Sequence, residues 1–510
     1  MTSLLILSFS TLERDPRVQR QIELFAEDYE VTTVGFGPQP HPGVTHLELP
    51  GETRAWPSSK KHLLTGRYRQ AYWAMSAVRA AHETLNELVG AMDIVLANDV
   101  NTLPLALWLA PRRGVHADLH EYAPREKEHV RSWRWFIAPY QRWICRTCLP
   151  QVDSVTTVSP GLAAEYHDQF GVDVEVVTNA AAYEQRSPRP TEGTIRLLHT
   201  GVARANRRLD AMIDALRGAP DGVTLDLMLV PSEPGYIDAL RERAADLPAV
   251  RFREPVPYTE LVETVAEYDV SIVVFPATTF NLEHSLPNKL FEAVQARTAV
   301  LVGPSPDMVD LVREHGIGEV LEGADADALR SALATMTPED VDGWKQASDA
   351  AARELSAEHQ VSGWSRALAR LAEQGEPLLL AERPCRAHAR REQVATGRGP
   401  ARGSGPRYAA EPGRCRTARD AAMNLRGASR SSRCSGDEVS RVAGRPWRRR
   451  ACAARTSTAV STVGSRQAST SSRSARDRGA RQPGERVITR AVMSARARRS
   501  EGVQIATSSR

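Results

Sequence analysis

The chain has 510 residues with 66 Lys and Arg against 62 Asp and Glu, a net charge of +4. Residues 381–510 hold 30 Arg, no Lys and 9 acids, a net of +21, so the first 380 residues carry −17. The apolar fraction of 42% excludes fibrous and collagen-like classes. No apolar run approaches the ~20 residues of a membrane-spanning helix, and residues 1–10 lack a secretory leader, so we expect a cytoplasmic protein.

Residues 1–380 alternate short apolar runs with longer helical patterns, which predicts α/β units built on mainly parallel sheets. A Pro-, Arg- and Ser-rich stretch at 187–193 interrupts the alternation and divides the two units. The expected strands of the first unit are Leu4–Ser8, Val31–Gly35, Ile94–Ala97, Gly114–Leu119, Asp153–Val158 and Val174–Thr178. The expected strands of the second unit are Ile195–Thr200, Thr224–Val230, Val250–Phe252, Val270–Phe275 and Ala299–Val302.

Helical patterning ends at Ala369–Glu373. From residue 381 onward few aliphatic residues are present, so this tail cannot bury enough apolar surface to fold, and we predict disorder. One hypothesis is a polycationic arm for nucleic acid or an anionic surface. The favoured hypothesis is an extension without a selected function, because residue usage changes abruptly and Lys disappears.

The stretch 281–292 follows an expected strand and predicts an anion site at the start of a helix. Ser285 is the candidate N-cap and Pro287 suits the first turn. The free N–H groups and the positive end of such a helix favour a phosphate. Lys289 adds a point charge, and the Glu292 carboxylate can accept two hydrogen bonds from vicinal ribose hydroxyls. A plain surface helix is the alternative for this stretch taken alone.

A second candidate anion site follows the strand 195–200. Gly201 permits close approach of a ligand to the backbone. Arg204 and Arg207 follow, and arginine binds diphosphate oxygens in a bidentate manner. A solvated charge cluster is the alternative, but two such sites after strands of one unit strengthen each other.

Polar residues in the first unit also stand at strand ends. Asn98 and Asp99 follow one strand, and the sequence Asp118-Leu-His120-Glu121 ends another. A hydrogen-bonded structural histidine is an equally good explanation of His120. At the start of the first helix, Asp15 is a candidate cap and Arg17 a candidate partner for an anion.

Two further patterns are weaker. Cys145 and Cys148 are spaced like half a zinc site, but the body offers no second pair, so we interpret them as semi-buried structural cysteines. Residues 132–149 interleave Trp, Tyr and Phe with Arg, as in an interfacial membrane helix. A helix packed on the edge of its unit is the favoured interpretation.

The order of these motifs resembles the family-4 retaining glycosyltransferases of the GT-B fold. The resemblance rests on 15–18, 98–99, 118–121, 157–160 and 285–292, with Gly201 followed by Arg207, and spans residues 3–375. It implies two Rossmann-like domains with a cleft between them. The corresponding boundaries are 1–186 for an acceptor domain, 187–355 for a nucleotide-sugar domain, 356–376 for a closing helix that crosses back, and 381–510 for the tail.

The resemblance also implies roles for individual residues. Glu292 would hold the ribose, and Arg207 would replace the family's diphosphate lysine. Further donor-site residues would be Ser285, Leu286, Asn288, Lys289, Gly201 and Arg204. His120 would face the donor sugar, and the substrate-binding set would also include Glu121, Asp99 and Arg17.

This chain departs from the family pattern at three places. His284 stands where the family often has a second glutamate, and Val202 stands where it often has an arginine after the glycine. The first loop is Ser8-Phe-Ser-Thr rather than glycine-rich.

The resemblance implies a nucleotide-sugar donor, a sugar, lipid or small-molecule acceptor, retention of configuration and no metal cofactor. We expect a role in polysaccharide or glycolipid synthesis, with peripheral contact at the inner face of a membrane as a further expectation and no nucleic-acid partner. The alternatives are a tail-mediated binding protein and a GT-B-shaped sugar-nucleotide epimerase. A dehydrogenase is disfavoured, because no Gly-x-Gly-x-x-Gly follows the first strand.

Overall fold

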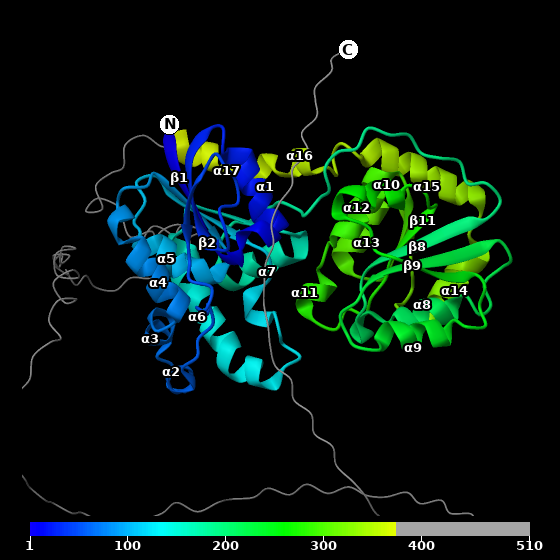
Figure 1. The fold of residues 1–510 in the computed structure, drawn as a ribbon, viewed down its shortest axis with the longest axis horizontal. Helices are drawn as coiled ribbons and strands as arrows, with labels where there is room; N and C mark the ends of the chain where they lie inside the picture. Colours follow the sequence, from blue (N-terminus) through cyan, green and yellow to red (C-terminus); the bar gives the residue numbers. More distant parts are fainter. Residues whose placement is uncertain (374–510) are drawn as a thin grey trace, which may run out of the picture. The chain divides into compact units, whose positions relative to one another are not determined.

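The computed structural model describes residues 1–373, which form two parallel sheets flanked by helices (Figure 1). The first sheet has seven strands in the order β3-β2-β1-β4-β5-β6-β7, and the second has six in the order β10-β9-β8-β11-β12-β13. The α/β class expected from the sequence is therefore confirmed. We call residues 2–176 the first lobe and residues 195–351 the second lobe.

The strands of both sheets pair in parallel throughout. Those of the first lobe are β1 (Thr2–Thr11), β2 (Tyr29–Phe36), β3 (Thr45–Glu48), β4 (Ile94–Asn98), β5 (Gly114–Leu119), β6 (Ser154–Thr157) and β7 (Glu175–Val176). Those of the second lobe are β8 (Ile195–Val202), β9 (Val223–Val230), β10 (Val250–Arg253), β11 (Val270–Val273), β12 (Ala299–Val302) and β13 (Gly318–Val320).

Helices connect successive strands, as parallel pairing requires. Those of the first lobe are α1 (Pro16–Phe25), α2 (Lys60–Leu64), α3 (Tyr68–Trp73), α4 (Ser76–Thr84), α5 (Leu103–Trp108), α6 (Ala138–Cys148) and α7 (Pro160–Phe170), with the π-helical turn η5 (Trp133–Ile137) before α6. Short 3₁₀ turns of this lobe are η1 (Leu12–Arg14), η2 (Asn86–Leu88), η3 (Val100–Thr102), η4 (Ala123–Arg125) and η6 (Leu149–Gln151).

The second lobe follows the same plan. Its helices are the 3₁₀ turn η7 (Ala205–Arg207), then α8 (Leu209–Ala215), α9 (Tyr236–Arg243), α10 (Tyr258–Val265), α11 (Phe280–Glu283), α12 (Asn288–Ala296), α13 (Pro306–His315), α14 (Ala326–Thr335) and α15 (Pro338–Ala351).

The strand order reverses beside the first strand of each sheet, between β1 and β4 and between β8 and β11. Open parallel sheets bind ligands at such switch points, outside the carboxyl ends of the strands. The central strands are covered on both faces, and β4, β5, β11 and β12 are buried along their whole length. This burial fixes the strand ends from which the polar residues project.

The chain ends its described part with α16 (Ala357–Gln360) and α17 (Ser362–Glu373). Helix α17 packs in one apolar cluster with β1 and α1, as Figure 1 also shows. Trp364 and Leu368 of α17 are fully buried beside Leu4 and Ile6 of β1. The last described helix therefore completes the core of the first lobe.

Three local predictions differ from the structure. The strands β3 and β13 were not expected from the sequence, and β7 has two residues where five were expected. Each of these strands lies at an edge of its sheet, where burial and pairing are one-sided. The predicted disordered tail, 381–510, lies outside the described residues.

Candidate functional site

A pocket of ≈ 370 Å³ opens at the carboxyl ends of β8 and β9, against the start of α12. One wall contains Thr200 and Gly201 at the end of β8. The floor contains Asn288, Lys289 and Glu292 of α12. The structure thus brings together four residues that the sequence analysis assigned to the donor, namely Gly201, Asn288, Lys289 and Glu292.

Gly201 is required by the close approach of Lys289. The Lys289 ammonium donates a hydrogen bond to the Thr200 carbonyl at 2.6 Å. A Cβ on residue 201 would lie 3.0 Å from that ammonium, and the φ of Gly201 is +139°. Any side chain at this position would therefore strain the backbone and displace the cation.

Lys289 and Glu292 both have pKa values moved toward neutrality. Burial, reinforced by the Arg207 cation, lowers the pKa of Lys289 to about 8. Burial raises the pKa of Glu292 to about 7, although Lys289 and Arg20 act in the opposite direction. Such shifts arise where charged groups are desolvated by burial, and they are typical of functional sites.

The start of α12 adds a partial positive charge to the same pocket. The helix begins at Asn288, with Pro287 in an extended conformation before it, and no side chain caps this end. Its first N–H groups therefore point toward the pocket without a side-chain acceptor. An anion placed here would meet the helix end, Lys289 and the Arg207 field together.

Arg207 lies in the turn η7 after β8. Its guanidinium stacks over the Phe275 ring, 4.9 Å from the centroid. Burial, assisted by the neighbouring cation Arg204, lowers the pKa of Arg207. Arg204 is exposed, and its Nε donates to the Ser232 hydroxyl at 3.4 Å. Arg207 is not part of the pocket wall, but its charge acts directly on Lys289.

The N-cap prediction for Ser285 is wrong. The Ser285 hydroxyl donates to the Leu282 carbonyl at 3.0 Å, and Pro287 occupies the cap position instead. Proline disfavours the helical conformation of the residue before it, here Leu286, so the helix cannot begin earlier. Leu286 is 7% exposed and packs in the apolar core with Leu290, so its side chain does not line the pocket.

His120 follows β5 and is held from three sides in the first lobe. Its Nε2 lies 3.2 Å from the Asn98 amide oxygen and 3.6 Å from Asp118 Oδ2. Its backbone N–H donates to Asp99 at 3.1 Å, and its Nδ1 lies 3.7 Å from the same carboxylate. Burial alone would lower the pKa of His120, but the Asp99 and Asp118 carboxylates outweigh burial and raise it.

Asp118 is the centre of this network and is completely buried. Arg17 donates to both of its oxygens, at 2.7 and 2.6 Å, and Gln21 donates at 2.7 Å. Thr156 and Trp364 of α17 donate to Oδ1 at 2.6 and 3.2 Å. Burial opposes ionisation, yet the Arg17 guanidinium holds the pKa of Asp118 well below its usual range. The anion that Arg17 meets is therefore this carboxylate.

Asp99 and Glu121 stand on either side of His120. Asp99 has a φ of +63° and a ψ of 159°, a strained conformation for any residue except glycine. Such strain is held where surrounding contacts over-determine the backbone, as in functional sites. Desolvation, followed by the nearby Glu126 and Asp99 carboxylates, raises the pKa of Glu121 to about 7. The Asn281 amide, after β11, donates to Glu121 at 3.3 Å.

His284 does not replace the family's second glutamate as a pocket residue. Its Nδ1 lies 3.3 Å from Asp307 Oδ2, and its ring lies tilted against the Phe280 ring, with the centroids 4.6 Å apart. Both Asp307 oxygens also accept from the backbone N–H of Gly161, at 3.1 Å. A Cβ on Gly161 would collide with the His284 ring at 1.9 Å. His284 therefore serves a packing contact with the start of α7.

The opposite pocket wall contains residues that no sequence motif had indicated. Val256, Tyr258 and Leu261 line it from the loop after β10 and from α10. Arg20 of α1 bonds with the Tyr258 hydroxyl, and its charge reaches Glu292. The proline residues before Tyr258 signal a strand-to-helix loop at a sheet edge, but no local pattern singles out Arg20.

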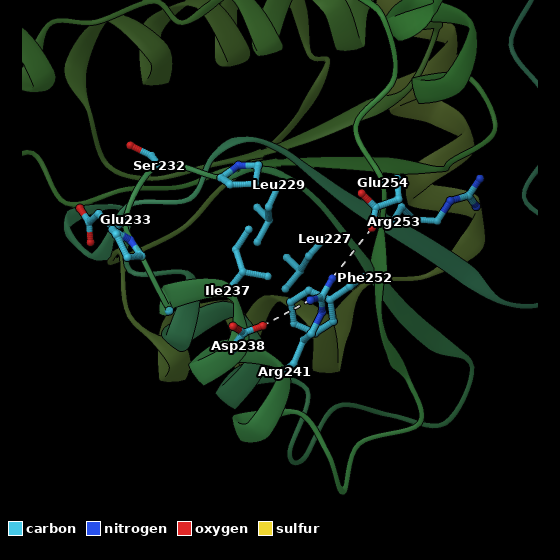
Figure 2. A pocket seen from close by; sticks show the side chains of 13 residues that line it. Leu227, Leu229, Ser232, Glu233, Ile237, Asp238, Arg241, Phe252, Arg253 and Glu254 are labelled. Carbon is cyan, nitrogen blue, oxygen red and sulfur yellow. Dashed lines mark hydrogen bonds and ion pairs between the residues drawn. The ribbon is translucent and has the colours of Figure 1, made fainter. Parts of the chain in front are cut away.

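A second pocket, of ≈ 510 Å³, lies between β9, β10 and α9 (Figure 2). Leu227 and Leu229 line it, whereas Met228 and Val230 line the first pocket. Because side chains alternate along a strand, the two pockets lie on opposite faces of β9. The rim residue Arg241 pairs with Asp238 at 3.4 Å and with Glu254 at 4.0 Å, so its charge is already balanced.

Cys145 and Cys148 are free and buried rather than semi-buried. Burial raises the pKa of the Cys148 thiol to about 12 and also raises that of Cys145, so both stay neutral. Within residues 1–373, no group of three or more His, Cys, Asp and Glu side chains is arranged to hold a metal. The helices of this range are all too short or too polar to cross a bilayer.

The chain is similar to proteins of known family and structure. Residues 22–184 match the family model described as Glycosyltransferase Family 4. None of the curated proteins compared with the chain matches it. Sucrose-phosphate synthase from Thermosynechococcus elongatus superposes with a TM-score of 0.54 at 13% identity, covering 73% of this chain and 99% of that one.

Two further solved structures share the fold. HepE of Anabaena in complex with UDP-glucose gives a TM-score of 0.53 at 13% identity, with 72% of this chain and 100% of that chain covered. An α,α-trehalose-phosphate synthase (UDP-forming) from Burkholderia vietnamiensis gives 0.52 at 14% identity, with 73% and 98% covered. These superpositions confirm the GT-B fold expected from the sequence.

Proposed function

We propose that this chain, a family-4-like protein of the GT-B fold, is a retaining glycosyltransferase that uses a nucleoside diphosphate sugar as donor. The family match and the fold support the transferase class. The observation that carries the donor assignment is the pocket where Lys289, Glu292 and the uncapped start of α12 meet beside Gly201. A buried cation, a helix N-terminus and a buried carboxylate in that arrangement suit a diphosphate joined to a ribose.

In this proposal Lys289, Arg207 and the N-terminus of α12 bind the diphosphate. Glu292, in its ionised form, accepts hydrogen bonds from the two ribose hydroxyls. The apolar wall formed by Val256 and Leu261 leaves room for the base. The UDP-forming trehalose-phosphate synthase and the UDP-glucose complex of HepE give the same fold a nucleotide context, which supports the proposal without identifying the sugar.

The reaction transfers the sugar from the diphosphate to an acceptor hydroxyl. The acceptor oxygen bonds to the anomeric carbon, the bond from that carbon to the diphosphate breaks, and the hydroxyl proton passes to the leaving phosphate. Negative charge develops on the diphosphate during this step, so preorganised cations lower the barrier. We expect Arg207 and Lys289 to supply this stabilisation without a metal ion.

His120 is the first-lobe candidate for contact with the donor sugar. The two carboxylates beside it favour its protonated form, and its ring is fixed by Asn98. A fixed imidazolium can donate a hydrogen bond to a sugar hydroxyl more strongly than a neutral ring. The acceptor stays a sugar, a lipid or a small molecule with a free hydroxyl, and polysaccharide or glycolipid synthesis stays the proposed context.

The decisive experiment incubates the full chain with a panel of nucleotide sugars and hydroxyl acceptors, and measures the nucleoside diphosphate released. Acceptor-dependent release and retained anomeric configuration, read by NMR of the product, are the expected results. An inverted product would overturn the retaining mechanism. Conversion of the donor sugar without any acceptor would instead support the epimerase alternative.

A further inference from the structure

Two segments of the first lobe carry positive charge that contrasts with their acidic surroundings. Residues 54–73 contain five Lys and Arg and no acids, and residues 125–149 contain six Lys and Arg against two acids. Their combined charge of +9 lies within the first 380 residues, whose net charge is −17. We call these two segments the cationic face.

The packed-helix interpretation explains only the inner side of this face. Trp133 is 7% exposed and Tyr140 and Ile144 are fully buried, so η5 and α6 do cover the edge of the lobe. On the outer side, however, Trp135 is 70% exposed and Leu64 is 67% exposed. Large apolar side chains at such exposure gain nothing from the fold of this chain.

The two segments lie side by side rather than at separate places. The rings of Trp56 and Trp133 contact edge to face at 5.3 Å. The Lys127 ammonium lies over both rings, at 5.2 and 5.1 Å. Tyr68 of α3 contacts the Trp143 ring at 6.1 Å. Exposed apolar tips from both segments therefore belong to one surface.

The positive charge of this surface is largely uncompensated. Its two acids, Glu126 and Glu128, are paired with Lys127 and with Arg125. Arg131 and Arg134, on either side of Trp133, and Lys60 and Lys61 of α2 are exposed. Basic side chains around apolar tips complement a surface with negative charge outside and hydrocarbon beneath.

We propose that the cationic face docks on an anionic lipid surface, with Trp135 and Leu64 entering the headgroup region and the arginines contacting lipid phosphates. Aliphatic Leu64, and Val130 at 38% exposure, favour a lipid over a nucleic acid, because they offer no ring on which a base could stack. Docking in this way places the first lobe at a membrane without a spanning helix. It would bring lipid-borne acceptors within reach of the proposed transferase.

The test is flotation of the full chain with vesicles of phosphatidylcholine, alone or mixed with phosphatidylglycerol. We expect flotation only with the anionic vesicles. Each arginine near such a surface contributes about fivefold in partitioning, so R131Q/R134Q should bind roughly 25-fold more weakly. Quenching of tryptophan fluorescence by brominated lipid should fall in W135F, because the inserted ring is lost.

The matched controls are Val89→Ala, exposed in the first lobe, and Arg313→Gln, exposed on α13, which should float like the wild type. Thermal unfolding should be unchanged in all variants, because the replaced side chains are exposed. Equal flotation of wild type and R131Q/R134Q would overturn the proposal and assign binding to the Arg-rich tail. Failure of the wild type to float with anionic vesicles would also overturn it. So would a wild type that does not bind vesicles but binds single-stranded DNA, with that binding abolished in R131Q/R134Q. The assay measures binding alone, so its outcome is independent of the proposed transferase activity.

Discussion

The polar sites of the two lobes are built on opposite principles. In the first lobe, Asp118 is surrounded by donors, and Arg17 and Trp364 are committed to it. In the second lobe, the charges that act on Lys289 are those of Arg207 and Glu292, and both members of the Lys289–Glu292 pair have pKa values near neutrality. The first network is internally satisfied, whereas the second is the one that we propose binds the donor diphosphate.

This difference separates groups that position from groups that bind. A buried carboxylate with several donors has little freedom to move, so it can hold His120 at a fixed point. Desolvated cations without a full complement of partners gain more from a ligand, because the ligand restores what burial removed. The two regions should therefore respond differently to mutation, one through stability and the other through turnover.

Asp118→Asn should give the largest effect, a loss of about 3–5 kcal/mol in the free energy of unfolding, because it leaves the buried Arg17 cation without its anion. Urea unfolding followed by far-UV circular dichroism measures this loss. The pKa of Asp118 is depressed, so its contribution is present above the unfolded value near 3.8 and is lost as pH falls below it. The difference between wild type and variant should therefore shrink in acid.

The matched control for that variant is Asp246→Asn. Its partner Arg217 lies on the surface, at an Nη1 to Oδ2 distance of 2.5 Å. Surface ion pairs contribute little, so the unfolding free energy should barely change. Equal losses in both variants would contradict the special status of the Asp118 network.

Arg207→Ala should leave the fold intact and reduce kcat by roughly 10²- to 10³-fold, since it removes one preorganised cation from the leaving diphosphate, worth about 2.7–4 kcal/mol. Released nucleotide under saturating donor measures the effect. Arg208→Asn is the control, because Arg208 pairs with Asp210 and has a φ of +54° that asparagine tolerates. Wild-type turnover in Arg207→Ala would refute the diphosphate assignment.

Glu292→Gln should weaken donor binding by about 1.5–3 kcal/mol, roughly 10- to 150-fold, because hydrogen bonds to a charged acceptor are replaced by weaker ones. The measurement is a double-mutant cycle with the 2′-deoxyribose form of the donor. If Glu292 holds the ribose, Glu292→Gln should weaken binding of the deoxy donor less than it weakens binding of the normal donor. Additive losses would place the ribose elsewhere.

The dependence of kcat/KM on pH should show the smallest effect, and it depends directly on Glu292 and Lys289 of the second lobe. Glu292 becomes ionised as pH rises through about 7, which favours the ribose contact. Lys289 loses its proton as pH rises through about 8, which weakens the diphosphate contact. The ratio kcat/KM for the donor should therefore peak between these values, and Glu292→Gln should remove the acidic limb. A flat profile from pH 6 to 9, about a unit beyond each limb, would contradict both assignments.

The sequence predicted the central architecture because buried parallel strands are apolar on both faces and leave an unambiguous pattern. Strands such as β4 and β12 were therefore located almost to the residue. The edge strand β3, Thr-His-Leu-Glu, has only partial burial and its pattern resembles a loop. The three-residue β13 is too short for any periodicity.

Motif order also predicted most of the pocket that we propose for the donor, but not the position of each residue. Gly201, Lys289 and Glu292 meet in the pocket because they belong to strand ends and helix starts of one lobe. Ser285 was misassigned because a cap candidate in sequence was displaced by Pro287 two residues later. Arg17 bonds to the buried Asp118 carboxylate, whereas the charge of Arg20, three residues further along α1, acts on Glu292.

The position of Trp364 has a consequence for how this chain is made. Asp118 emerges early from the ribosome, yet its indole donor is encoded 246 residues later. During synthesis, the early half must wait for nearly all of the intervening chain before its buried carboxylate receives its last partner. A gene truncated just ahead of α17 would thus yield a first lobe that lacks the Trp364 hydrogen bond to Asp118 and the apolar packing of α17 on β1.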